Sequence, residues 1–101
     1  MPTLTAKDFG FEILRQWREA EGGGFTNAVI RAGDLHRGLG GYPGPENRMP
    51  VCCDVMKRMM DSSVDSILSQ PPKGKGASLC IRYRFPRRSI DTTGDEARSR
   101  L

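Results

Sequence analysis

Glycine and proline divide this chain into short segments, and this division limits its possible folds more than any other feature. The 101 residues include 12 glycines and 7 prolines, and neither residue type continues a helix or a central strand well. The main breaks fall at residues 22–24, 40–41 and 42–47. The segments between them suffice for one small domain of short helices and strands. This organisation excludes a large multidomain enzyme.

The first segment predicts an amphipathic helix from about Thr5 to Glu21. Thr5 followed by Asp8 is typical of a capping box, and the three glycines after Glu21 end the helix. Its apolar residues recur every three or four positions, as one buried helix face requires: Ala6, Phe9, Ile13, Trp17 and Ala20. We interpret this helix as scaffold, with Trp17 in the core rather than on a base-stacking surface.

The middle of the chain predicts shorter elements. Residues 25–31 suit one small strand or an extended entry into the next element. Asp34 can cap a brief helix over residues 35–39, which Gly40 ends. Residues 42–47 hold two prolines and a glycine, so they predict a loop.

A second strong helix is predicted from Val51 to about Ser62, with Asn47 or Met49 as its cap and Pro50 in its first turn. One side carries apolar residues at helical spacing: Cys52, Val55, Met56 and Met59. The other side carries Cys53, Asp54, Lys57, Arg58 and Asp61. The spacing predicts two i,i+4 ion pairs, Asp54–Arg58 and Lys57–Asp61, which leaves Arg48 at the helix entrance as a freer cation.

The C-terminal part predicts a β-hairpin. Residues 64–69 and 79–85 form its two strands, and the basic run 71–76 forms its turn. In the second strand Leu79, Ile81, Tyr83 and Phe85 share one face, while Cys80, Arg82 and Arg84 share the other. Burial of the aromatic face would turn both arginines outward. We expect a folded domain over residues 1–88 and a disordered polar tail over residues 89–101.

The net charge of +4 is concentrated in one stretch. Residues 1–65 hold eight Lys or Arg and nine Asp or Glu, residues 66–90 hold six and none, and residues 91–101 hold two and three. A concentrated basic element suits a polyanion, because each cation near a phosphate releases condensed counterions. The same distribution also fits a solvated charged face.

The order of these elements over residues 5–86 resembles that of winged helix-turn-helix domains, in which a helix pair is followed by a two-stranded wing. The resemblance implies a small α+β fold of about three helices, a short strand and a C-terminal hairpin. It also implies a recognition helix over residues 48–62 and a wing tip at Lys73, Gly74 and Lys75. The runs 33–37, 40–44 and 48–50 resemble those of small uncharacterised prokaryotic proteins, and that likeness carries no activity to transfer.

The winged-helix resemblance implies binding of nucleic acid, with double-stranded DNA as the favoured partner and RNA left open, and no catalysis. Five or six phosphate contacts would give a log–log salt slope of about −5. Asn47 is a weaker candidate for reading bases. The contacts are expected from nine basic residues: Arg48, Lys57, Arg58, Lys73, Lys75, Arg82, Arg84, Arg87 and Arg88.

A protein-interaction or inhibitor module is the main alternative, because the same basic hairpin can meet an acidic protein partner. An enzyme is not expected, since the chain has one histidine and no nucleophile-elbow, P-loop or zinc-protease motif. We interpret His36 as a surface or helix-end histidine rather than a general base. A homodimer is left open.

The three cysteines predict reduced, partly buried thiols rather than a disulfide framework, since their number is odd and two are adjacent. Zinc is the competing reading, with His36 as the fourth ligand. Neighbouring residues on a helix point about 100° apart, so Cys52 and Cys53 would hardly share one ion, and we expect no metal and no cofactor.

No window approaches the ~18 apolar residues of a membrane span, so we expect a cytoplasmic protein without membrane contact.

Overall fold

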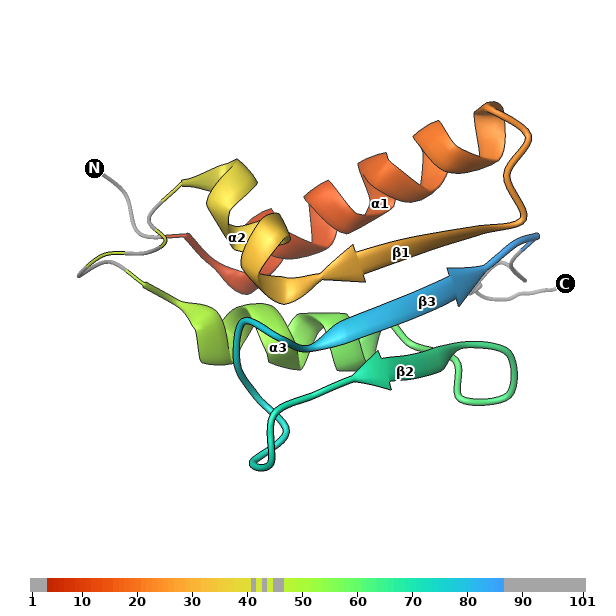
Figure 1. Cartoon of the computed structure of the whole chain (residues 1–101). Coiled ribbons are helices and arrows are strands. Elements are labelled where there is room, and N and C mark those ends of the chain that lie inside the picture. Colours follow the sequence, from red (N-terminus) through yellow and green to blue (C-terminus); the bar gives the residue numbers. More distant parts are fainter. Residues whose placement is uncertain (1–3, 41, 43, 45–46, 87–101) are drawn as a thin grey trace, which may run out of the picture.

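In the part of the chain that the structure describes, three helices and one antiparallel sheet of three strands form the fold, which confirms the predicted small α+β class (Figure 1). The computed structural model describes residues 4–40, 42, 44 and 47–86. Its elements are α1 (Ala6–Gly22), β1 (Asn27–Arg31), α2 (Ala32–Leu39), α3 (Met49–Arg58), β2 (Ser66–Ser69) and β3 (Cys80–Arg84). Arg87, Arg88 and the predicted tail lie outside the described residues. None of the helices in the described part combines the length and apolar character needed to cross a membrane.

The sheet has the strand order β1-β3-β2, so β3 is its central strand. Ile81 and Tyr83 of β3 are fully buried, and the Tyr83 hydroxyl donates a hydrogen bond of 2.7 Å to the Met56 carbonyl of α3. This face of the sheet therefore packs on the helices. Because side chains alternate along a strand, Arg82 and Arg84 point to the opposite face, as predicted.

Helix α1 matches its sequence prediction. The Thr5 hydroxyl accepts the Asp8 N–H at 3.4 Å, and the Asp8 carboxylate accepts the Thr5 N–H at 2.8 Å, so the capping box is present. Phe9, Ile13 and Trp17 are buried. The ring centroids of Trp17 and Tyr83 lie 4.9 Å apart, which confirms Trp17 as a core residue.

Helix α2 begins earlier than predicted. It starts at Ala32, directly after β1, and its N-cap is Arg31 rather than Asp34. The reason is a contact from a distant loop: the Ala32 N–H donates to the Leu79 carbonyl at 2.8 Å, and the Gly33 N–H to that of Ala77 at 3.0 Å. These carbonyls satisfy the first free N–H groups of the helix, so no side-chain cap is required.

Helix α3 is shorter than predicted, because it ends at Arg58 rather than near Ser62. The chain beyond it is held by the buried Asp65, whose carboxylate accepts N–H groups from Asp61 at 2.7 Å and Arg84 at 2.9 Å. These bonds draw the chain back toward β3. Arg48 is the N-cap, and the Asn47 side chain accepts the Met49 N–H at 2.7 Å.

Cys53 does not lie on the polar side of α3, where the helical pattern placed it. It is fully buried because the loop between β2 and β3 covers it. All three cysteines are buried and free of disulfides.

Candidate nucleic-acid interface

Residues 70–79, the β2–β3 loop, are fixed against α3. The Lys75 ammonium lies 2.8 Å from a carboxylate oxygen of Asp54. The Gly76 N–H donates to the Cys53 sulfur at 3.2 Å, and the Cys53 thiol lies 3.4 Å from the Gly76 carbonyl, in reach to donate. The loop and the helix therefore form one continuous surface.

This surface, which we call the α3–loop face, joins basic residues that are far apart in the sequence. Gly74 has a φ of +82°, and a Cβ added there would lie 3.0 Å from the Lys57 ammonium nitrogen, so Lys57 reaches the tip of the loop. Arg58 and Lys73 are exposed beside it. The face comprises Lys57, Arg58, Lys73 and Lys75, together with the acidic Asp54, whereas Arg48 is exposed at the opposite, N-terminal end of α3.

Asp54 pairs with Lys75 instead of with Arg58, so the first predicted i,i+4 pair is wrong. The physical reason is the packing of the loop, which brings the Lys75 ammonium to 2.8 Å from Asp54. Both side chains are about half exposed, so the pair contributes less than about 1 kcal/mol to stability. It neutralises one loop cation and leaves Arg58 outside the ion pairs of the described residues.

His36 positions the backbone that carries Arg48. Its side chain is 0% exposed, its Nε2 accepts the Arg48 N–H at 2.8 Å, and its Nδ1 lies 3.1 Å from the Gly40 carbonyl oxygen. Since Nε2 accepts, Nδ1 must carry the proton and donate it to Gly40. The ring is thus a neutral clamp across the connection between α2 and α3.

This arrangement corrects the interpretation of His36 as a surface residue. It does stand at a helix end, but neither ring nitrogen is free to serve as a general base. A histidine in the last turn of a helix that ends in glycine was the sequence signal for such a bond to a terminal carbonyl.

Arg82 and Arg84 lie apart from the α3–loop face, on the sheet face turned away from the helices. We call this the outer sheet face. The register places Val29 opposite Arg82 and Arg31 opposite Cys80, so Arg31 shares the same face. Arg31 was missed as a site residue, although alternation with the inward Ile30 was a signal for it. The Arg82 Nε is buried and has no hydrogen-bond acceptor among the described residues.

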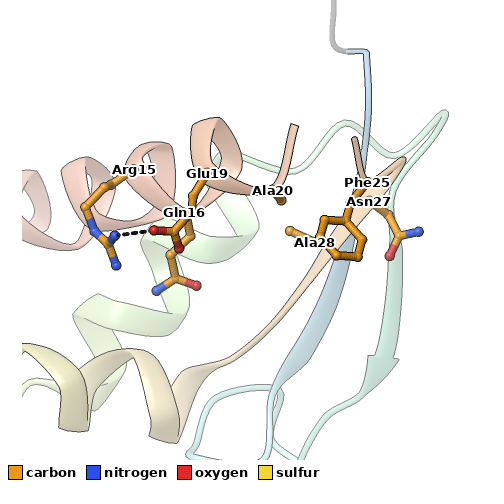
Figure 2. Close-up of a pocket in the computed structure, with 7 residues that line it drawn as sticks. All are labelled: Arg15, Gln16, Glu19, Ala20, Phe25, Asn27 and Ala28. Atoms are coloured by element: carbon orange, nitrogen blue, oxygen red, sulfur yellow. Dashed lines mark hydrogen bonds and ion pairs between the residues drawn. The ribbon is translucent and has the colours of Figure 1, made fainter. Parts of the chain in front are cut away.

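A shallow groove of about 360 Å³ runs between α1 and β1 (Figure 2). Its α1 wall is polar, and Arg15 lies 2.7 Å from Glu12 and 3.4 Å from Glu19. The hydrogen bond from Arg15 lowers the pKa of Glu12 to about 2. The groove is lined by Arg15, Gln16, Glu19, Ala20, Phe25, Asn27 and Ala28.

The thiols on α3 are not arranged to hold a metal. Burial, and to a lesser degree the adjacent Cys53, raises the pKa of Cys52 to about 12, and burial also raises the pKa of Cys53. Both therefore stay protonated at neutral pH, whereas a metal ligand must be a thiolate. Within the described ranges, no group of three or more His, Cys, Asp or Glu side chains could hold a metal ion.

Comparisons with protein-family models, with curated proteins and with solved structures find no match to this chain. We therefore infer its function from the geometry and the charge of the chain alone.

Proposed function

We propose that this chain is a winged-helix domain that binds double-stranded DNA through the α3–loop face, without catalysis. In support, α2 and α3 follow one another and precede two antiparallel strands, β2 and β3, that are joined by a basic loop. This order supports our interpretation of a helix pair followed by a two-stranded wing. In such domains the second helix of the pair, which here is α3, enters the major groove.

One observation carries the proposal: the basic loop is anchored to α3, which brings the Lys57 ammonium of the helix beside Gly74, which lies between Lys73 and Lys75 in the sequence. The anchor consists of the Lys75–Asp54 ion pair and the contacts between Cys53 and Gly76. A duplex that meets α3 would therefore meet the loop without further ordering of the chain. Cations held in place lose less conformational entropy on contact with phosphates than cations on a mobile tail.

The cations of the face have different tasks in this proposal. Lys73 and Lys75 flank Gly74, so the backbone can approach phosphates closely. Arg58 and Lys57 project from α3, where they can reach phosphates or base edges. The Asn47 side chain already accepts the Met49 N–H, which lowers its value for reading bases.

The test is fluorescence anisotropy of a labelled mixed-sequence duplex, measured from low to physiological salt. Four phosphate contacts predict a log–log salt slope of about −4 for the wild type. The double variant Arg58→Glu, Lys73→Glu should bind at least about tenfold more weakly, with a slope smaller by about 2.

A matched control separates this face from net charge. Lys7→Glu, Arg18→Glu changes two exposed α1 residues and gives the same change of charge. At physiological salt its affinity should stay within about threefold of the wild type, because exposed charges beyond a Debye length are screened. Absence of binding at low salt, or equal losses in both double variants, would contradict the proposal.

A further inference from the structure

Strand β1 has a free edge with a defined hydrogen-bonding phase. Beyond its two ends, the Phe85 N–H donates to the Thr26 carbonyl at 2.8 Å and the Ala32 N–H to the Leu79 carbonyl at 2.8 Å. Bonded and non-bonded pairs alternate in an antiparallel ladder, so Ala28 and Ile30 bond to β3. Asn27 and Val29 therefore direct their N–H and C=O groups away from β3, along the edge of the sheet.

The opposite edge of the sheet is a poorer template for a further strand. β2 has four residues, and its register with β3 shifts between Ile67 and Ser69, which is a bulge or irregularity. Bulges bend an edge strand and interrupt its pairing. β1 pairs with β3 over five consecutive residues without a shift. Edge addition is therefore favoured at β1.

The side of this edge that belongs to the outer sheet face is basic, with an apolar centre. Val29 is 53% exposed and stands opposite Arg82, and Arg31 is exposed two residues further along β1. The Arg82 Nε adds a buried donor without an acceptor in the described part of the chain. Guanidinium groups match carboxylates in planar, paired hydrogen bonds.

The other side of the edge opens on the groove between α1 and β1 (Figure 2). Ala20 and Ala28 leave space there, and the ring of Phe25, which is 66% exposed, stands at its end. Arg15 and Glu19 form its polar rim and pair with each other at 3.4 Å. The apolar part of the groove, formed by Ala20, Phe25 and Ala28, therefore suits small apolar side chains.

We propose that an extended acidic segment of a partner protein binds here as an additional antiparallel strand on β1. Its acidic side chains lie on the outer sheet face near Arg31 and Arg82, and its alternate apolar side chains enter the groove. Main-chain hydrogen bonds supply affinity and the two sets of side chains supply specificity. A phosphate backbone has acceptors for the free N–H groups of β1, but it has no donor for the free carbonyls and no apolar group for Val29 or Phe25, so protein is favoured over nucleic acid. The site is separate from the α3–loop face and does not depend on DNA binding.

The probe is a short fluorescein-labelled peptide of alternating glutamate and valine. A residue directly opposite Val29 has its side chain on the outer face and exchanges hydrogen bonds with Val29. N-methylation of the glutamates should therefore reduce binding at least about tenfold, because it removes the donors that face β1. N-methylation of the valines should leave binding within about twofold, since their N–H groups point outward.

Variants of the chain test the same geometry. Val29→Pro removes a donor at the free edge and no bond to β3, and edge strands tolerate proline there. It and Arg31→Glu should each weaken peptide binding about tenfold or more. Arg18→Glu on α1 is the matched charge control and should bind normally. Circular dichroism and thermal unfolding establish whether each variant is folded. If Val29→Pro does not fold, the two N-methylated peptides still test the proposed hydrogen bonds on the wild-type chain.

Several results would overturn the proposal: no binding of the peptide, equal binding of a peptide of alternating lysine and valine, or no difference between the two N-methylated forms. Dimerisation of the chain that Val29→Pro abolishes, without peptide binding, would assign the edge to a second copy instead. Loss of peptide binding in Arg31→Glu with unchanged duplex anisotropy supports this site independently of the DNA proposal. Failure of the duplex assay alone leaves the peptide result standing.

Discussion

His36 connects two helices through both of its ring nitrogens. Replacement by alanine would leave the Arg48 N–H and the Gly40 carbonyl without their partners and would open a cavity beside Phe9, whose ring centroid lies 5.1 Å from that of His36. We expect His36→Ala to lower the free energy of unfolding by about 2–4 kcal/mol.

The measurement is urea unfolding followed by circular dichroism. Arg37→Ala, in the neighbouring position with a side chain 59% exposed, is the control and should cost less than about 1 kcal/mol. Similar losses in the two variants would show that His36 is not the clamp of this connection.

Cys52 links stability to alkaline pH. Its pKa is about 12 in the folded chain against an ordinary value of 9.0, so the unfolded chain releases this proton first. Between pH 9 and 12 the folded state holds more protons, and stability falls as pH rises, by up to about 1.4 kcal/mol per pH unit from this thiol. Below pH 9 this contribution is constant.

Cys52→Ala should be less stable than the wild type at neutral pH but show a shallower loss above pH 9. Urea unfolding at a series of pH values measures both slopes. Both chains contain the same lysines and tyrosines, so the difference between their free energies of unfolding cancels the titration of those residues. Parallel slopes would contradict the assignment of this loss to Cys52.

Single residues differ in how far the sequence alone could place them. The capping box of Thr5 and the core position of Trp17 depend on neighbours along the same helix, so helical spacing predicted them. Cys53 was misplaced because its burial depends on Gly76, which is distant in the sequence. The helix-end position of His36 was predicted, but its burial was missed for the same reason, since its partner is the backbone of Arg48.

At the scale of elements, the β2–β3 loop depends on close approach at Gly76. A Cβ there would lie 2.9 Å from the Pro71 Cγ, and the φ of +158° is one that other residues rarely adopt. Gly76→Ala should therefore destabilise the chain by about 1–3 kcal/mol and weaken the contact of the loop with Cys53.

Gly38→Ala gives the opposite sign and serves as the control. Gly38 lies inside α2 with nothing within 4 Å of an added Cβ, so alanine should stabilise the helix by about 0.5–1 kcal/mol. Thermal unfolding of the two variants compares them directly. A stabilised Gly76→Ala variant would show that the loop does not need this conformation.

Asp54 limits the affinity of α3 for a polyanion in the proposed function. Asp54→Asn removes the acid of the face and frees Lys75, whose ammonium is 2.8 Å from it, while the contacts between Cys53 and Gly76 still hold the loop on α3. We expect duplex binding to strengthen several-fold at low salt and the log–log salt slope to steepen by about 0.9. Anisotropy measures both, with Asp34→Asn on α2 as the control. Unchanged binding in Asp54→Asn would argue against the α3–loop face as the contact surface.

Element boundaries follow the same division between local and distant causes. The extent of α1 was predicted because its cap, its apolar spacing and its terminal glycines are all local. The start of α2 is set by carbonyls of Leu79 and Ala77, and the end of α3 by the chain turning back to Asp65. None of these contacts leaves a periodic signal in the sequence.

At the scale of the whole molecule, the fold divides a charge cluster that is continuous in the sequence. Residues 66–90 carry six basic residues and no acid, and alternation in β3 turns Arg82 and Arg84 away from the loop that carries Lys73 and Lys75. The sequence could therefore predict a basic site but not that its members lie on two faces. The pairing of β1 with β3, which adds Arg31 to the second face, required the fold.

This division predicts that DNA and an acidic peptide bind at the same time. The proposed peptide site lies along the edge strand β1, whereas the α3–loop face is built from α3 and the loop that joins β2 to β3, so in a molecule with extents of 45 × 28 × 28 Å we expect only long-range electrostatics to couple them. With a Debye length of about 8 Å at physiological salt, a saturating peptide should change the duplex dissociation constant by less than about twofold.

At low salt the peptide should weaken duplex binding modestly, because its carboxylates reduce the positive field of the chain. Anisotropy of the labelled duplex against unlabelled peptide measures this coupling. Full displacement of the duplex at physiological salt would mean that both ligands use one surface.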